Sequence, residues 1–90
     1  MGKKTRKATK ASIPAFNCVD GSTIENISQL ATALEQMSED SYYFHVNAER
    51  NDFGTWVRDV FNAHQLADTL PPGHSREQSV ISVLKYMLQR

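Results

Sequence analysis

The sequence predicts a mainly α-helical fold: a compact bundle of about five short helices with a small N-terminal β-hairpin or extended segment and a disordered basic arm. Three observations lead to this prediction. The chain has 90 residues, which is enough for one domain and too few for two. Apolar residues recur with the 3.6-residue period of a helix in several successive segments. Only a short stretch near the N-terminus combines extended character with the turn residues of a hairpin.

The basic arm is defined by charge. Five of the ten basic residues lie in the first ten positions, where no acidic residue occurs, and the remaining 80 residues carry 5 basic and 10 acidic groups, or −5. Charge repulsion and the lack of apolar residues predict that residues 1–12 form a flexible arm and residues 13–90 a single helical domain. The basic residues of the arm are Lys3, Lys4, Arg6, Lys7 and Lys10.

The hairpin and the first helix follow the arm. The segment 16–19 is extended in character, Asp20-Gly21 is typical of a tight turn, and Thr23-Ile24 can return as a second short strand. From residue 27 the apolar period changes to that of a helix, which predicts a helix near 27–37. Its apolar stripe consists of Ile27, Leu30, Ala31, Leu34 and Met37.

The next segment is open to two interpretations. Ser38 is a good N-cap and is followed by two acidic residues, which favours a second helix. The run 42–46 has strong strand propensity, but the capping residues and the continuation through 48–50 favour the helix. In a helix, Tyr42 and Val46 share one face, with Tyr43 beside them.

The third helix has the best-defined apolar stripe in the chain. Asn51 is expected to cap it and Asp52 places a negative charge in its first turn. Trp56 lies in the middle of the stripe, so we expect the indole to face the core. The stripe consists of Phe53, Trp56, Val57, Val60 and Phe61, and the opposite, polar face carries Asp52, Thr55, Asp59 and Asn62.

Two further helices complete the bundle. A short fourth helix must end at Pro71-Pro72-Gly73, because proline lacks the backbone donor and clashes with the preceding turn. Ser75 and Gln78 form a capping box that opens the last helix. The fourth helix would bury Leu66, Ala67 and Leu70, and the last would bury Val80, Val83, Leu84 and Met87, with Ile81 and Leu88 widening the stripe.

The central segment 45–61, with the letters HVNAERNDFGTWVRDVF, and the following Leu66-Ala67 carry a resemblance to a known family. They resemble small prokaryotic domains of unknown function, in which a His-Val-Asn segment precedes an Asn-Asp-Phe helix start and a Trp-Ile/Val-Arg-Asp-Val turn. The turn at 20–21 and the helix around 30–34 extend the resemblance over roughly residues 16–70. The chain departs from the pattern at Asn62-Ala63, where the family has Gly-Asp, and this changes the residue available to end the third helix. The resemblance implies a compact helical domain, alone or as a module, and no established activity.

Polar residues concentrate where the second and third helices are expected to meet. A histidine beside a carboxylate is the minimum for acid–base chemistry, so His45 and Asp52 are the catalytic alternative, although no nucleophile is evident. The favoured interpretation is structural, because Asn51 and Asp52 suit a helix start and an imidazole can lock the joint. We take as the candidate interaction cluster His45, Asn47, Arg50, Asn51 and Asp52, with Tyr42 and Tyr43 as exposed interface residues.

The sequence predicts no metal site and no cofactor. The three histidines and Cys18 have none of the paired short spacings of a zinc site, and no glycine-rich phosphate loop occurs. One cysteine suits a reducing cytoplasm, and no long apolar segment predicts a signal peptide or a membrane span.

We therefore expect a non-catalytic protein-interaction or structural module in the cytoplasm, with a protein partner and an oligomeric state that the sequence leaves open. The alternative is a nucleic-acid-associated accessory protein that binds phosphates weakly and without sequence preference through its basic arm. The third hypothesis is an enzyme that uses His45 and Asp52.

Overall fold

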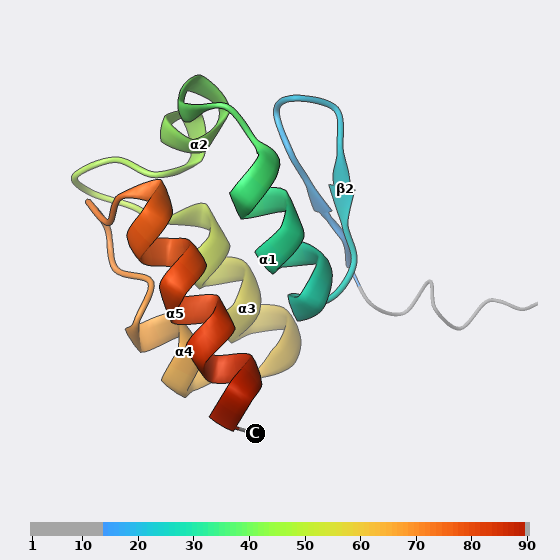
Figure 1. Cartoon of the computed structure of the whole chain (residues 1–90), viewed down its shortest axis with the longest axis vertical. Coiled ribbons are helices and arrows are strands. Elements are labelled where there is room, and N and C mark those ends of the chain that lie inside the picture. The colour runs from blue at the N-terminus through green and yellow to red at the C-terminus, as the bar shows by residue number, and fades with distance from the viewer. Residues whose placement is uncertain (1–13, 90) are drawn as a thin grey trace, which may run out of the picture.

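The structure is a computed structural model that describes residues 14–89. It is a helical bundle with a small antiparallel hairpin at one edge, which confirms the predicted fold class (Figure 1). The predicted arm, residues 1–12, and the expected domain start at residue 13 lie outside the described residues. The elements are β1 (Phe16–Asn17), β2 (Thr23–Ile24), α1 (Ile27–Gln36), α2 (Glu39–His45), α3 (Asp52–Phe61), α4 (His64–Asp68) and α5 (Arg76–Gln89).

The hairpin pairs Phe16 with Ile24 across β1 and β2. Its turn is closed by two backbone hydrogen bonds between residues 18 and 22 and between 21 and 18, and Gly21 has a φ of 94°, a left-handed conformation that glycine adopts without strain. Such a small sheet cannot stand alone and must pack on helices. Phe16 does so by stacking on Phe53 of α3, with ring centroids 4.8 Å apart, while Ile24 is buried.

The predicted first helix is confirmed as α1. Asn26 caps it, because its side chain accepts a hydrogen bond from the backbone N–H of Gln29 at 2.8 Å. The helix packs mainly against α5, and Met37 lies just past its end. All five residues of the predicted stripe, Ile27, Leu30, Ala31, Leu34 and Met37, are buried.

The structure corrects the extent of the second helix. Ser38 caps α2 as predicted, accepting a hydrogen bond from the backbone N–H of Ser41 at 3.0 Å. However, α2 ends at His45, and the expected continuation through residues 48–50 is wrong. Residues 46–51 instead form a loop closed by an isolated bridge between Val46 and Asn51. The Asn47 side chain accepts from the backbone N–H groups two and three residues ahead, at 2.8 and 2.9 Å, and this turn competes with a helix.

The apolar ridge of α3 faces inward as the sequence predicts. Phe53 and Val57 are fully buried, Trp56 is 8% exposed, and Val60 and Phe61 pack partly buried against the core. The helix ends at Asn62, whose φ of 53° is left-handed. Asparagine tolerates this conformation better than most residues other than glycine. Asn62, which stands where the resemblance would place glycine, therefore still allows the helix to stop there.

The last two helices close the bundle. Leu66, Ala67 and Leu70 are buried as predicted, and α3 approaches the end of α4 so closely that a Cβ on Gly54 would lie 2.7 Å from the carbonyl oxygen of Leu70. The capping box at the start of α5 is confirmed. Figure 1 shows α5 at the front of the bundle, with no other helix in front of it.

The predicted stripe of α5 is partly wrong. Its buried residues are Ser79 and Val83, with Val80 and Met87 partly buried. Leu84 is 39% exposed, and the two residues expected to widen the stripe are more exposed still, Ile81 at 53% and Leu88 at 86%. The helix is apolar on more than one side, so its period does not reveal which side meets α1. In the described part of the chain, no helix is long and apolar enough to cross a membrane.

Candidate functional site

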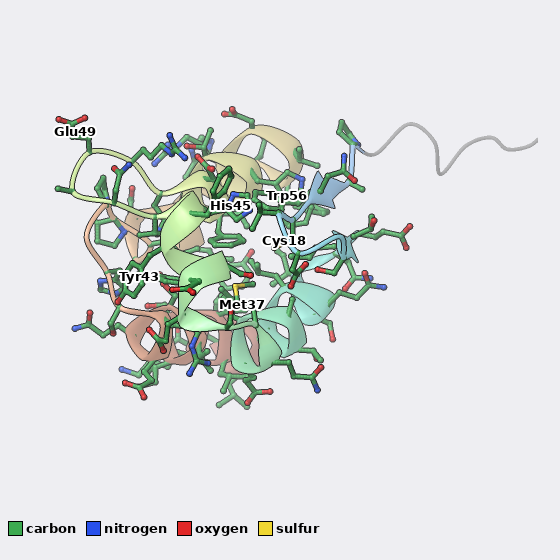
Figure 2. The ribbon with its side chains drawn as sticks, turned by 90° about the horizontal axis from the view of Figure 1, so that it is seen from above. Cys18, Met37, Tyr43, His45, Glu49 and Trp56 are labelled. Carbon is green, nitrogen blue, oxygen red and sulfur yellow. The ribbon has the colours of Figure 1, made fainter. Side chains whose placement is uncertain are left out.

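The predicted polar cluster lies where α2, the loop 46–51 and α3 meet the hairpin. Figure 2 shows His45, Trp56 and Cys18 on the same side of the domain, near β1. The ring of Phe16 lies between His45 and Trp56, since its centroid is 4.9 Å from that of His45 and 5.9 Å from that of Trp56. The structure therefore brings the hairpin into the cluster, which the sequence did not predict.

His45 is buried at 6% exposure, and both of its ring nitrogens are hydrogen-bonded. Its Nε2 lies 3.0 Å from the backbone nitrogen of Val19, which can only donate, so Nε2 is the acceptor and carries no proton. The proton is then on Nδ1, which donates to Oδ2 of Asp52 at 3.0 Å. The neutral imidazole thus ties the hairpin turn to the junction of α2 and α3.

Asp52 shares its carboxylate between two neighbours. While Oδ2 accepts from His45, Oδ1 forms an ion pair with Nε of Arg50 at 3.2 Å. Arg50 also donates through Nη2 to the backbone oxygen of Phe44 at 2.8 Å, and so ties the loop to the end of α2. The Arg50 and Asp52 side chains are 51% and 34% exposed, and a pair so open to water contributes at most about 1 kcal/mol.

Asn47 and Asn51 form hydrogen bonds within the fold. Asn51 is 4% exposed, and its side-chain oxygen accepts from the backbone N–H groups of residues 53 and 54, at 3.0 and 3.1 Å. Its side-chain nitrogen donates to the backbone oxygen of Pro71 at 3.2 Å. The backbone oxygen of Asn47 accepts from the N–H of Gly73 at 2.8 Å. Both asparagines thus hold the 71–73 turn against the α2–α3 loop.

The two tyrosines have opposite environments, and the prediction of exposure is wrong for one of them. Tyr42 is fully buried, and its hydroxyl lies 2.7 Å from Oγ of Ser79. The same hydroxyl can donate a hydrogen bond to the backbone oxygen of His74 at 2.8 Å or of Ser75 at 3.1 Å. Burial raises the pKa of the Tyr42 phenol, and the hydrogen bond with Ser79 opposes that rise. Tyr43 is 47% exposed, as an interface residue would be.

The structure adds two exposed apolar residues that the sequence interpretation missed. Phe44 is 56% exposed and Val19 is 49% exposed. Both adjoin His45, since the Phe44 ring makes an edge contact with the imidazole at 5.0 Å and the Val19 backbone donates to it. Phe44 could have been found from the pattern, because a helix that buries Tyr42 and Val46 must turn the residue midway between them outward. We name Val19, Tyr43 and Phe44 the hairpin–α2 surface.

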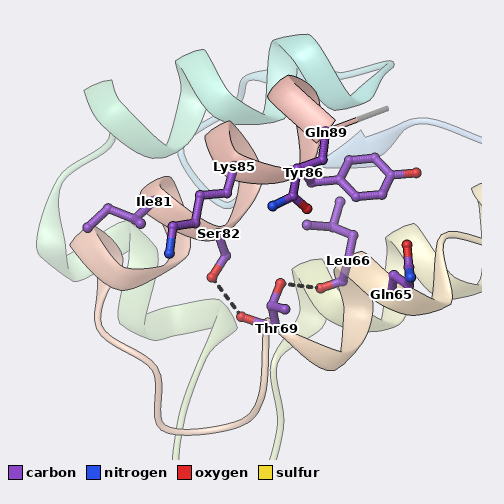
Figure 3. Close-up of a pocket in the computed structure, with 8 residues that line it drawn as sticks. All are labelled: Gln65, Leu66, Thr69, Ile81, Ser82, Lys85, Tyr86 and Gln89. Atoms are coloured by element: carbon purple, nitrogen blue, oxygen red, sulfur yellow. Dashed lines mark hydrogen bonds between the residues drawn. The ribbon is translucent and has the colours of Figure 1, made fainter.

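The cluster is poorly arranged for acid–base chemistry. Nε2 of His45, the nitrogen that a thiolate or hydroxyl mechanism would need, is occupied by a backbone amide, and Cys18 beside that amide is buried. Three surface cavities are present and none of the three is lined by His45, although Arg50 and Asn51 of the cluster line the one beside the start of α3. They lie between α4 and α5 (390 Å³, Figure 3), between the hairpin and α1 (470 Å³), and beside the start of α3 (350 Å³).

The remaining sequence predictions concern the basic arm, metal binding and the family resemblance. The five basic side chains of the arm lie outside the described residues. Within residues 14–89, the histidine, cysteine and acidic side chains form no group of three or more that could hold a metal ion. No protein-family model, curated protein or solved structure matches the chain. The resemblance of the central segment to a domain family therefore stays a prediction.

Proposed function

We propose that this chain is a non-catalytic protein-interaction module that binds its partner through the hairpin–α2 surface. The observation that carries the proposal is the contrast between this surface and the cluster beneath it. Val19, Tyr43 and Phe44 are each about half exposed, whereas the polar groups of His45 and Asn51 are hydrogen-bonded internally. The polar cluster thus serves as the support, and the exposed side chains of Val19, Tyr43 and Phe44 are available for binding.

Rigid support makes such a surface effective. Large aromatic side chains contribute much of the binding energy of protein interfaces, and they lose little entropy when their backbone is already fixed. His45 fixes the backbone of Val19, and Arg50 fixes the backbone oxygen of Phe44. The two sides of the surface are therefore held by neighbouring residues of the same cluster.

Chemistry at His45 is less well supported. To act as a general base, the imidazole would have to give up the hydrogen bond from Val19 and open to solvent from 6% exposure. The single cysteine of the chain favours a reducing compartment, so we place the interaction in the cytoplasm.

The test is affinity capture from a lysate of the source organism with the full chain as bait. Phe44→Asp and Tyr43→Ala should each lose a partner that the unchanged chain retains. Leu88→Asp is the matched control, because it changes an exposed apolar residue of α5 and should retain that partner. The proposal is wrong if every protein captured by the unchanged chain is also captured by the Phe44 variant.

A second candidate function rests on the basic arm. Five cations within ten residues can neutralise phosphates and release counterions, and the net charge of −5 on the rest of the chain leaves the arm as the contact. Removal of residues 1–12 should abolish the fluorescence anisotropy change with a labelled DNA duplex. For the full chain, the slope of log affinity against log salt should not exceed about 4.5 in magnitude, the value for five phosphate contacts.

A further inference from the structure

The outer face of α5 carries an exposed apolar stripe, which at Ile81 borders the cavity between α4 and α5. Ile81, Leu84 and Leu88 are 53%, 39% and 86% exposed, and their spacing of three and four residues places them on one side of the helix. Single exposed apolar residues are ordinary, but three in one row along a helix are not. The side facing α1 is a different one, centred on Ser79 and Val83.

The stripe has the spacing of a helix-pairing surface. Glu77, Ile81, Leu84 and Leu88 follow one another at intervals of four, three and four residues, the alternation of the two core positions of a coiled coil. Three of these four positions are occupied by isoleucine or leucine, the residues that such positions favour. A second helix is therefore the structure that fits this face.

The charges along the stripe indicate that the pairing helix is a second copy of α5. Glu77 lies at one end of the stripe and Lys85 lies beside it towards the other end. Within residues 14–89, neither forms an ion pair. In two parallel copies of α5, Glu77 would face Glu77 and Lys85 would face Lys85, so like charges would meet. In two antiparallel copies, Glu77 lies beside Lys85 of the other copy. The face is thus complementary in charge to itself, provided the two helices run in opposite directions.

The apolar residues fit the same arrangement. If the two-fold axis passes between Ser82 and Val83, Ile81 lies opposite Leu84 of the second copy and Leu84 opposite its Ile81. Leu88 then covers the aliphatic part of Glu77, and Lys85 lies within one helical turn of that carboxylate. Such a contact is isologous: both copies use the same residues, as in most two-fold homodimers.

We propose that the chain forms an antiparallel homodimer through the outer face of α5. A helix of 14 residues is only about 21 Å long, so a contact confined to it falls below the standard protein interface of roughly 1,600 Å². The dimer is accordingly a weak one, with dissociation in the micromolar range, on the order of 1–100 μM. This association uses a face other than the hairpin–α2 surface and goes beyond the partner binding proposed above.

Sedimentation of the full chain over the range from about 1 μM to 1 mM tests the dimer. The unchanged chain should shift from monomer to dimer with concentration, and Ile81→Asp and Leu84→Asp should stay monomeric throughout. Phe44→Asp, an equally exposed apolar residue on α2, should dimerise like the unchanged chain. Circular dichroism confirms that each variant is folded, and at exposed positions we expect no loss of helix.

Charge reversal tests the direction of the helices. Glu77→Lys and Lys85→Glu should each weaken the dimer about fivefold, since two symmetry-related pairs change from attraction to repulsion. The double variant should recover the original affinity, and 1 M NaCl should remove the differences between the variants. The proposal is overturned by a monomeric unchanged chain at about 1 mM, by dimerisation of Ile81→Asp, or by failure of the double variant to recover.

Discussion

At the scale of single residues, hydrogen-bonding capacity decides what each polar side chain of the cluster can do. His45 has two ring nitrogens and both are bonded, one to the backbone of Val19 and one to Asp52. Asn51 likewise uses its side-chain oxygen and nitrogen within the fold. A side chain whose polar atoms are all engaged within the fold supports its neighbours and has little left for a substrate. The residues of this region that are available for binding are therefore those of the hairpin–α2 surface.

The Tyr42 phenol gives the fold a dependence on alkaline pH. Burial raises its pKa above the ordinary value of about 10, so the folded chain holds this proton more tightly than the unfolded chain does. The stability that neutral Tyr42 contributes is present below about pH 10 and is lost as pH rises through the folded-state pKa. Urea midpoints measured across this range should fall steeply for the unchanged chain and for Tyr43→Phe. Tyr42→Phe should flatten the fall, and an equal slope for that variant would contradict the assignment.

Trp56 is a large core residue whose contribution to stability can be tested. Its indole is 8% exposed, contacts Phe16 and Phe61, and donates through Nε1 to the backbone oxygen of Pro14 at 3.0 Å. Trp56→Ala should therefore lower the free energy of unfolding by about 3–5 kcal/mol. Because Trp56 is the only tryptophan, urea unfolding is followed by far-ultraviolet circular dichroism. A loss of less than about 1 kcal/mol would place the indole outside the core.

At the scale of the elements, local sequence signals place the helix starts, and distant residues decide some of the helix ends. Ser38 and Asn51 cap α2 and α3 as the sequence predicts, and Asn26 caps α1, a role that the sequence analysis did not assign. The end of α2 depends on a loop whose Asn47 bonds both its own turn and the distant Gly73. The continuation through 48–50 was predicted from propensity, which is a weak influence beside such contacts.

Arg76 joins the start of α5 to the end of α1. It donates through Nη1 to the backbone oxygens of Leu34 and Glu35, at 2.9 and 3.2 Å, and through Nε to Oε2 of Glu39 at 2.9 Å. These carbonyls have no partner within the helix, so the guanidinium caps α1 from another element. The sequence interpretation did not identify this role, because Arg76 is 42 residues away from Leu34.

Replacement of Arg76 by alanine should lower the free energy of unfolding by about 1.5–3 kcal/mol, the range for hydrogen bonds to a charged group. Arg76→Lys should recover only part of this loss, since one ammonium cannot reproduce the planar fork that reaches two carbonyls and a carboxylate. Arg58→Ala, an exposed arginine on α3, is the matched control and should change stability by no more than about 0.5 kcal/mol. If Arg76→Ala and Arg58→Ala lowered the free energy of unfolding in urea by the same amount, the capping role of Arg76 would be ruled out.

At the scale of the whole molecule, charge divides the chain into a basic N-terminal arm and an acidic remainder. Five of the ten basic residues lie before residue 11, and the net charge of the remainder is −5. The first described contacts to the bundle come from Pro14, which accepts from Trp56, and from Phe16, which stacks on Phe53. The start of the hairpin is thus held to α3 by a hydrogen bond and by aromatic contacts.

Truncation tests this boundary. Removal of residues 1–12 should leave the free energy of unfolding within about 0.5 kcal/mol of the full chain, because Pro14 and Phe16 are retained. Removal of residues 1–16 takes away both contacts and should cost about 3 kcal/mol or more. Urea unfolding of the two truncated chains provides the comparison. Equal stability of both would show that the hairpin contributes nothing to the core.

The sequence alone determined the helical class, the starts of α1, α2, α3 and α5 and the inward ridge of α3, because caps and apolar periods act over a few residues. It predicted that residues 45–52 belong together, because they are close along the chain. Only the tertiary structure decided that Tyr42 is buried against Ser79, that His45 binds the hairpin, and that Ile81, Leu84 and Leu88 face outward. Each of these depends on which face of a helix meets a distant element, and a helix that is apolar on two sides carries no local signal for that choice.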